Sequence, residues 1–512
     1  MKEISSIPKK SSPVLVTGAA GGLGVHVVRA LSAAGWEVRA FDRVRPEDVG
    51  RASLVADLSG VSWTFSDDSE ALRPLLAGSK AIVHLAGLVT LSAEEDELMR
   101  ANLDLSRDVF EWATAEGVEQ FIHISCAFVY QSEQGVRIED SPTSAYNAFE
   151  RSKLAAERTL YRLANADEGA PALTVLRPGM LYGPGCKEMG AAMVTLPAIL
   201  RGVSRYLPGL SGGPRTNWCH VADAASAILV CLDNPAENAR VFNVADDTAL
   251  SFGEALTSII AGYGIDLGPS LPMPSVALWA LLIPIIDNDW AFDRTRAVLR
   301  FLWNRVQTEH KLDSPLRPRL NRNALFYVRD DAIVVADALR ELGWEPAFPD
   351  FRKGISETIR WYQDEGWVPR FDLDGIVERR DADSTIRLQY RERLRGRFKS
   401  AEGDEDFDLD LQISWPSLPW PPVSREGHIE GNLTVANLAE NTPIEGTITL
   451  RWLPSLVMEY EFGFLNDQGI ACRFHGTRQF QSHAPVNSLR EVTGKIIDSH
   501  AEVLGDVGAL SS

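Results

Sequence analysis

Short apolar runs alternate with amphipathic segments from Val14 to about Leu232. The runs VLVTG, EVRAFD, KAIVHLAG, FIHISCAFVY and LTVLRPG have the length and composition of buried strands, and helical periodicity separates most of them. This alternation is typical of βαβ units, which build a parallel sheet with helices on both faces. We therefore predict an α/β fold with a doubly wound parallel sheet.

The pattern changes twice further along the chain. Segments of mostly helical character follow from about Ser251 to Trp367, so we predict a smaller helical lobe, formed by about 180–215 and 250–367, inside a first domain of residues 1–370. An arginine-rich stretch, an acidic stretch and the proline-rich SWPSLPWPP follow. We interpret 371–420 as a connector whose opposite charges are solvated or paired with each other.

The last part of the chain alternates polar and apolar residues. HIEGNLTVANL, IEGTITLRW, LVMEYEFGFL and IACRFHGTRQF each show the period of two that is typical of a strand with one buried face. Residues 466–469, Asn-Asp-Gln-Gly, are predicted to turn between the last two. We predict an antiparallel β domain over 421–512, in which no chemical motif is found.

Composition limits the classes of function. The 512 residues carry 51 Lys+Arg and 70 Asp+Glu, so the formal net charge is 51 − 70 = −19, and 45% of the residues are hydrophobic. A disordered chain and a nucleic-acid-binding role are therefore not expected. The five cysteines form no CxxC pair, and no metal site is predicted.

We expect a cytoplasmic protein because no signal-like segment precedes Val14. The most apolar stretch, Leu271–Ile286, has 16 residues and three prolines, fewer than the ~20 residues that cross a bilayer. It could still lie on a membrane surface, so peripheral contact through 271–303 stays open, as does an ordinary packed helix. We also expect a homodimer.

A glycine-rich sequence, TGAAGGLG, lies between the first strand and the following helix. Glycines at 18, 21 and 24 allow a tight turn, close approach of a pyrophosphate, and close packing of helix on strand. The next strand ends at Asp42, whose carboxylate can accept the ribose hydroxyls of NAD and repel the extra phosphate of NADP. Arg43 could pair with that phosphate, so we favour NAD and leave NADP open.

These motifs resemble the extended short-chain dehydrogenases/reductases, the NAD-dependent epimerase/dehydratase superfamily, and among them the 3β-hydroxysteroid dehydrogenase-like branch. The resemblance covers roughly Val14 to Trp367 and includes Ala56-Asp57-Leu58, VHLAG, SKLAAE, LRPGMLYGPG and HVADAASA. It implies a Rossmann-type sheet. The cofactor-binding residues that we predict are Gly18, Gly21, Gly22, Leu23, Gly24, Asp42, Arg43, Asp57, Leu58, Leu85, Ala86, Gly87, Asn102, Lys153 and Pro178.

The catalytic positions depart from this family's pattern. The family uses Tyr and Lys in YxxxK with a Ser or Thr donor, but here Phe149 stands four residues before Lys153 and Cys126 takes the donor position, beside Ser125. Tyr146 lies seven residues before Lys153, so on one helix the two would share a face, since 700° is 20° short of two turns. We predict Tyr146 as a surrogate acid/base, with a packed loop tyrosine as the alternative, and Ser125 or Cys126 as contacts of the substrate oxygen.

The apolar lobe and the resemblance favour an NAD(P)-dependent oxidoreductase that acts on a hydrophobic secondary alcohol or ketone, sterol-like, lipid or polyketide. One alternative is a non-redox enzyme (isomerase, lyase or cyclase) or a regulatory nucleotide-binding protein in the same groove. A nucleotide-sugar epimerase or dehydratase is another, because arginines in the lobe could bind acidic groups. In a third, the β domain is the working part of a binding protein.

Overall fold

The structure is a computed structural model that describes residues 10–131, 135–188, 190–201, 207–237, 239–265, 267–272, 288–318, 321–327, 330–371, 388–401, 403–415, 425–451, 457–479, 491–499 and 502–511. These residues belong to two compact units, Met1–Leu373 and Asp374–Ser512. None of the helices within the described ranges is both long enough and apolar enough to cross a membrane. Part of the stretch predicted to touch a membrane, 273–287, lies outside the described residues.

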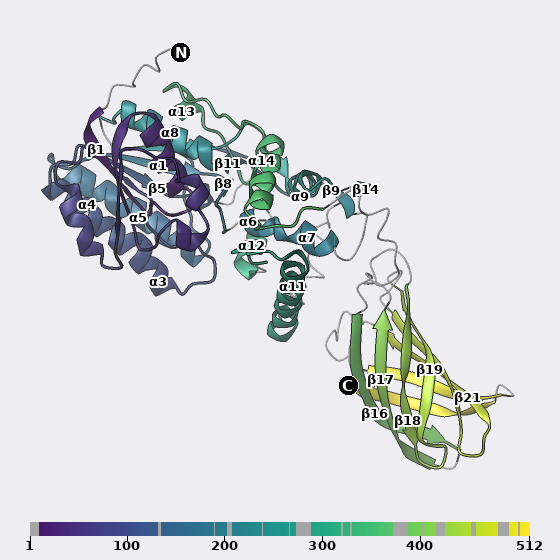
Figure 1. Cartoon of the computed structure of the whole chain (residues 1–512). Helices are drawn as coiled ribbons and strands as arrows, with labels where there is room; N and C mark the ends of the chain where they lie inside the picture. Colours follow the sequence, from purple (N-terminus) through teal and green to yellow (C-terminus); the bar gives the residue numbers. More distant parts are fainter. Residues whose placement is uncertain are drawn as a thin grey trace, which may run out of the picture. The chain divides into compact units, whose positions relative to one another are not determined.

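The first unit is organised around a parallel sheet, as the strand pattern predicts (Figure 1). Its described strands, in spatial order, are β12 (Arg240–Val244), β7 (Ala172–Pro178), β5 (Gln120–Ile124), β4 (Ala81–His84), β1 (Lys10–Thr17), β2 (Trp36–Asp42) and β3 (Val61–Phe65). The order runs outward from β1 in one direction and from β4 in the other. Ligands of open α/β sheets bind at such a switch point, outside the carboxyl ends of the strands.

Helices cover both faces of this sheet, which confirms the predicted layers. One core cluster joins the sheet to α1 (Gly24–Ala33) and α8 (Val221–Asp233). The cluster on the other face joins it to α2 (Arg73–Leu76), α4 (Leu105–Ala115) and α5 (Ala148–Ala166). A short helix, α3 (Glu95–Met99), precedes α4. The carboxyl ends of the central strands therefore lie at one edge of the sheet, between the two helical layers.

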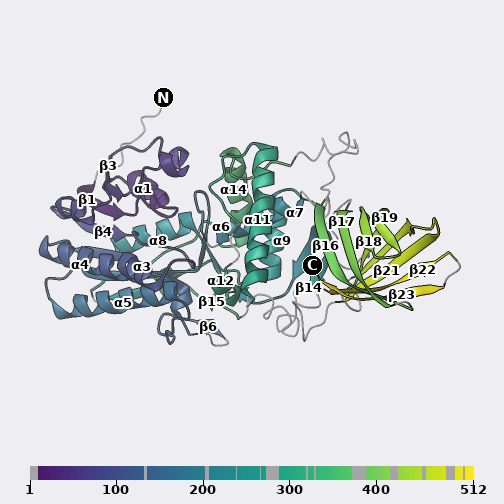
Figure 2. The ribbon, with the colours of Figure 1, turned by 90° about the horizontal axis from the view of Figure 1, so that it is seen from below.

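A smaller lobe is inserted after β7 and packs around its own apolar cluster. Its helices are α6 (Gly190–Met193), α7 (Thr195–Arg201), α9 (Phe252–Gly262), α11 (Asp289–His310), α12 (Arg322–Phe326) and α14 (Phe351–Asp364), whereas α13 (Asp337–Arg340) packs through Leu339 in the cluster of the sheet. Its strands, which pair in short two-stranded sheets, are β8 (Met180–Tyr182), β9 (Leu207–Ser211), β10 (Arg215–Thr216), β11 (Trp218–His220), β13 (Leu250–Ser251), β14 (Leu267–Pro272) and β15 (Ile333–Val334), the last of which pairs with β6 (Val136–Arg137). Figure 2 shows α9, α11 and α14 grouped in this lobe.

The second unit is a closed antiparallel barrel. Its strands are β16 (Leu388–Ser400), β17 (Gly403–Trp415), β18 (Arg425–Val435), β19 (Ala439–Arg451), β20 (Val457–Leu465), β21 (Ala471–Gln479), β22 (Glu491–Asp498) and β23 (Val503–Ser511). Each pairs with the next, and β23 returns to β16. The predicted turn is confirmed by the hydrogen bond from the N–H of Gly469 to the carbonyl of Asn466, 2.8 Å long.

The prediction of a connector over 371–420 is wrong for residues 388–400 and 403–415, which are β16 and β17. The arginines of β16 alternate with residues such as Leu394 and Phe398, which are buried in the barrel core, so the stretch has a strand's period of two. Its charges face those of β17, and Arg393–Asp408 and Arg397–Asp406 form ion pairs of 2.7 Å. The two charged stretches are thus neighbouring strands.

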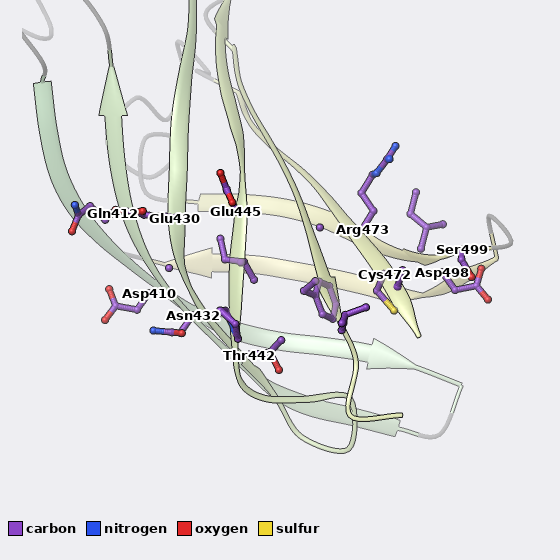
Figure 3. Close-up of a pocket in the computed structure, with 18 of the residues that line it drawn as sticks. Asp410, Gln412, Glu430, Asn432, Thr442, Glu445, Cys472, Arg473, Asp498 and Ser499 are labelled. Carbon is purple, nitrogen blue, oxygen red and sulfur yellow. The ribbon is translucent and has the colours of Figure 1, made fainter. Parts of the chain in front are cut away.

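A hollow of about 1390 Å³ lies on the barrel unit (Figure 3). Polar and charged side chains from several strands line it, among them Asp410, Glu430, Glu445 and Arg473. Glu445 lies 3.7 Å from the His428 ring on the neighbouring strand, and Arg473 forms an ion pair of 3.5 Å with Glu461. The hollow contains none of the residues that the sequence singled out for chemistry.

Candidate active site

The glycine-rich loop connects β1 to α1. Gly18 has φ +68°, and a Cβ there would lie 2.7 Å from the backbone nitrogen of Ala86. A Cβ at Gly24 would lie 2.1 Å from the carbonyl oxygen of Gly18, where the helix starts against the loop. Such contacts exclude any side chain. The loop therefore lies close against the segment after β4 and the start of α1, at the switch point where the phosphates of a dinucleotide approach the backbone in this kind of fold.

Asp42 lies at the end of β2 and holds this loop. Its Oδ2 accepts a hydrogen bond of 2.8 Å from the N–H of Ala20, and its Oδ1 accepts one of 2.7 Å from the N–H of Arg43. The Arg43 side chain is exposed. The carboxylate is thus fixed at the edge of the groove with an arginine beside it, and the choice between NAD and NADP stays a prediction.

The structure contradicts the adenine contacts predicted for Asp57 and Leu58. Both precede β3, which begins at Val61, so they lie at the amino end of that strand, whereas cofactors bind at carboxyl ends. Asp57 is exposed and pairs with Arg29 at 2.9 Å. At the carboxyl end of β3 stand Phe65 and Ser66. The N–H of Ser66 donates to the Asp42 carbonyl, 3.1 Å away.

Arg51 is a residue of this region that the sequence did not single out. Its guanidinium is buried, with Nε donating to the Gly185 carbonyl at 2.8 Å and Nη1 to the Ala20 carbonyl at 2.9 Å. It therefore joins the glycine-rich loop to the loop after β8. Because Arg51 lies outside every motif of the sequence, sequence reasoning gave no indication that it joins these two loops.

The floor of the groove follows β4. The N–H groups of Leu85 and Ala86 donate to Thr17, to its carbonyl at 3.1 Å and its Oγ1 at 3.3 Å. A Cβ at Gly87 would lie 2.6 Å from Oδ1 of Asn102 and 3.6 Å from Nζ of Lys153, so both side chains approach this backbone. Asn102 is fixed by donating to Oγ of Ser152 at 2.8 Å.

Lys153 lies on α5, which begins with a capping box. Asn147 caps the helix and its side chain accepts from the N–H of Glu150 at 3.0 Å, while the Glu150 carboxylate accepts from the N–H of Asn147. Two turns further on, Lys153 is buried and donates from Nζ to the Ile124 carbonyl at 3.0 Å. Burial lowers the pKa of Lys153. Its ammonium is therefore anchored at the end of β5.

Phe149 and Cys126, the two departures from the family pattern, belong to one apolar cluster. The other buried members are Leu98, Val129 and Leu154. Burial raises the pKa of the Cys126 thiol to about 12, so the sulfur is not a thiolate. Ser125 is also buried, and no hydrogen-bond partner of its Oγ is found in the described part of the chain. At the two positions where the family has polar catalytic side chains, this protein therefore has a protonated thiol and a phenyl ring, both in an apolar environment.

The structure overturns the argument that Tyr146 shares a helical face with Lys153. The helix begins at Ala148 with Asn147 as its cap, so Tyr146 precedes it, and its side chain is 54% exposed. Asparagine and the capping box stop the helix there, because the cap needs an extended backbone. Tyr146 instead lines a cavity of about 330 Å³.

A second tyrosine lines the same cavity. Tyr327 follows α12 and its hydroxyl donates to Oε1 of Glu150 at 2.8 Å. Its ring packs against Phe128, with ring centroids 4.4 Å apart. Burial and the nearby Glu150 carboxylate raise the pKa of Tyr327. Sequence reasoning missed Tyr327, because nothing in the lobe sequence links it to a helix start 177 residues earlier.

The structure thus gathers most of the predicted residues at the carboxyl ends of β1, β2, β4, β5 and β7. These are Gly18, Gly21, Gly22, Leu23, Gly24, Asp42, Arg43, Leu85, Ala86, Gly87, Ser125, Cys126 and Pro178. Asn102 and Lys153 join them from the neighbouring helical segments. Asp57 and Leu58 lie elsewhere, and Tyr146 lies at the cavity beside the start of α5.

The model of the NAD dependent epimerase/dehydratase family matches residues 14–245. Over these residues the chain is similar to this family. YbjS, an uncharacterized protein of Escherichia coli K12, is 26% identical over 373 residues, 70% of this chain and 99% of that protein. The ceramide reductase of Caulobacter vibrioides is 32% identical over 223 residues, 43% of this chain and 61% of that enzyme.

A solved structure agrees with this family's fold. The Streptomyces venezuelae dTDP-glucose 4,6-dehydratase DesIV, crystallised with NAD and TYD bound, has a TM-score of 0.52 and 21% identity to this chain. The match covers 70% of this chain and 98% of that one. At this identity the likeness supports the fold alone. The barrel lies beyond the residues that the family model matches.

Proposed function

We propose that this protein is an NAD(H)-dependent oxidoreductase that acts on a hydrophobic secondary alcohol or ketone, with NADP(H) as the alternative cofactor. The observation that carries the proposal is the apolar cluster at the end of β5. Cys126 and Phe149 pack there among Leu98, Val129 and Leu154. These apolar side chains stand where the family has polar catalytic groups, which favours an apolar substrate, and the similarity to a ceramide reductase supports the same class.

Several side chains of this site would take part. Bound NADH supplies the hydride that reduces a ketone. Lys153 would fix the ribose from its place beside Gly87, as the family resemblance implies. Ser125 and Cys126 would contact the substrate oxygen, because they lie at the end of β5 and the Ser125 hydroxyl is buried with no partner among the described residues.

Proton transfer is proposed to pass through a tyrosine of the 330 Å³ cavity. In the reducing direction a proton would leave the Tyr327 hydroxyl for the carbonyl oxygen. Glu150, whose Oε1 accepts a hydrogen bond of 2.8 Å from that hydroxyl, would take up a proton from solvent and pass it to the tyrosinate. Burial raises the pKa of Glu150, and the hydrogen bonds that its carboxylate accepts from Tyr146, Asn147 and Tyr327 oppose this shift. Tyr146 lines the same cavity and remains the second candidate.

The test has two steps. The purified protein is titrated with NADH and with NADPH, following energy transfer from tryptophan to the nicotinamide. It is then assayed for cofactor oxidation with a panel of steroid and long-chain ketones, and for reduction of NAD+ with UDP-glucose as the polar comparison. Micromolar binding with turnover of an apolar ketone is the expected result. Failure to bind either cofactor, or turnover of UDP-glucose alone, would contradict the proposal.

A non-redox role in the same groove is the second candidate. Phe149 favours it, because a phenyl ring cannot transfer the proton that the family's tyrosine transfers. This role predicts nucleotide binding without hydride transfer to any ketone. It also predicts that Tyr146→Phe and Tyr327→Phe leave the protein's activity unchanged.

A further inference from the structure

Helix α11 is apolar on two opposite faces. One face is buried, with Phe292, Trp303 and Val306 at most 8% exposed, and Nε1 of Trp303 donates to the Leu316 carbonyl at 3.0 Å. This face holds α11 on the lobe. In Figure 1 the helix extends below α7 and α12, and in Figure 2, seen from below, it lies in front of α9.

The opposite face of α11 carries large apolar side chains in the open. Trp290 is 52% exposed, Val298 55% and Phe301 67%. At 100° per residue, Phe301 lies 20° and Val298 80° around the helix from Trp290, so the three share one side. The outer side of a helix packed on a domain is usually polar. An exposed aromatic ridge of this kind marks an interaction surface.

Arginines surround this ridge. The helix contains four of them, Arg294, Arg296, Arg300 and Arg305, against three acids, Asp289, Asp293 and Glu309, so its side chains sum to 4 − 3 = +1 in a chain of net charge −19. The acids are already paired, with Arg322, Arg296 and Arg305 respectively. Within the described residues, Arg294 and Arg300 have no acid within 4 Å, and Arg294 lies over the Trp290 ring at 5.5 Å.

Exposed aromatic side chains next to arginines favour one kind of partner. Trp and Phe with neighbouring arginines are the side chains of helices that lie in the interface of an anionic membrane. In a symmetric dimer this patch would meet an identical patch with the same net positive charge. Charge complementarity therefore favours a lipid surface over a second copy of the chain.

We propose that α11 docks the protein on an anionic lipid surface, with Trp290, Val298 and Phe301 inserted among the lipids and Arg294 and Arg300 on the headgroups. The proposal rests on residues of α11 alone and does not depend on the proposed reaction. Docking would bring the lobe of the enzyme to a membrane, where apolar substrates dissolve.

The test is co-sedimentation of the full chain with vesicles of phosphatidylcholine, with or without phosphatidylglycerol. We expect binding to the anionic vesicles, weakened by salt. Phe301→Glu and Val298→Glu should each lower the partition coefficient about tenfold or more, because an inserted apolar side chain is replaced by a charge. Val503→Glu is the matched control, since Val503 is 52% exposed on the barrel. Circular dichroism and thermal unfolding of each variant verify folding.

Three outcomes would overturn the proposal. One is equal binding to neutral and anionic vesicles, and another is an equal loss of binding in Val503→Glu. The third is a dimer in sedimentation velocity that Val298→Glu dissociates, without vesicle binding by the wild-type protein, which would assign the ridge to a second copy. Failure of the oxidoreductase proposal appears in the cofactor titration instead, so the two proposals fail independently.

Discussion

The hydroxyl of Tyr327 lies 2.8 Å from Oε1 of Glu150, although the two residues come from different parts of the first unit. The same hydroxyl accepts a hydrogen bond of 2.9 Å from Nδ2 of Asn147, the cap of α5. Tyr327 thus connects the smaller lobe to the start of the helix that carries Phe149 and Lys153. A phenol joined to a buried carboxyl group next to a cavity is an arrangement that can transfer a proton.

Replacing Tyr327 by phenylalanine is therefore expected to lower ketone turnover about 10²- to 10⁴-fold, the usual effect of losing a general acid or base. Tyr146→Phe is the matched variant, and we expect it to cost less than about tenfold on the same scale. NADH affinity should be unchanged in both. Steady-state assays with the best ketone of the panel decide between them. The reverse order of effects would return the role to Tyr146.

Phe149→Tyr tests whether the site can return to the family pattern. The new hydroxyl would enter the cluster that holds Cys126, four residues before Lys153. If proton transfer limits turnover, the variant should be faster than the wild-type protein by about tenfold or more, and it should restore activity to Tyr327→Phe. Single-turnover oxidation of NADH measures this step. An unchanged rate in both backgrounds would mean that proton transfer does not limit the reaction.

Much of the first unit could be predicted from the sequence, because its strands, helices and glycine-rich loop each depend on residues that are close together in the chain. The periods of the strands and helices predicted the layers of the α/β fold. The glycines at 18 and 24 predicted a tight loop, and the structure has no room for a side chain at either position. The connector was wrong for a physical reason. The many charged residues of β16 and β17 are typical of a connector, but in β16 they alternate with the buried residues Leu394 and Phe398, as in a strand.

The remaining site depends on contacts between distant residues. Tyr327 meets Glu150 only because the lobe folds back on α5, and no spacing rule carries that information. Asp57 matches a short motif of the family, but a residue at this sheet can contact the cofactor only if it follows β3. Asp57 precedes β3. Tyr146 failed the helical argument because the asparagine after it caps the helix.

Asp246 gives the first unit a pH-dependent stability. Burial raises the pKa of its carboxyl to about 8 from an ordinary value of 3.8, and its Oδ1 accepts from the N–H of Trp218 at 3.0 Å. The folded state therefore holds a proton that the unfolded state has lost, across the range from about pH 4 to about pH 8. The free energy of unfolding should fall as pH rises through this range, by at most about 1.4 kcal/mol per pH unit.

Asp246→Asn should remove this slope, because an amide does not titrate. Urea denaturation at several pH values between 5 and 8 measures it. Asp247→Asn is the neighbouring control, since the Asp247 side chain is exposed and pairs with Arg340 on the surface. We expect its slope to match that of the wild-type protein. A wild-type stability that stays constant over this pH range would contradict the raised pKa.

Asp42 should set the preference between the two cofactors. Its negative charge repels a 2′-phosphate, while its Oδ2 also holds the N–H of Ala20 at 2.8 Å. Asp42→Asn keeps an oxygen for that hydrogen bond and removes the charge, so it should raise affinity for NADPH relative to NADH about tenfold, a change of about 1.4 kcal/mol. Arg43→Gln should act in the opposite direction and lower affinity for NADPH alone. Energy-transfer titrations of both variants with both cofactors measure these changes. Equal losses for NADH and NADPH in Asp42→Asn would mean that the carboxylate acts only by holding the glycine-rich loop.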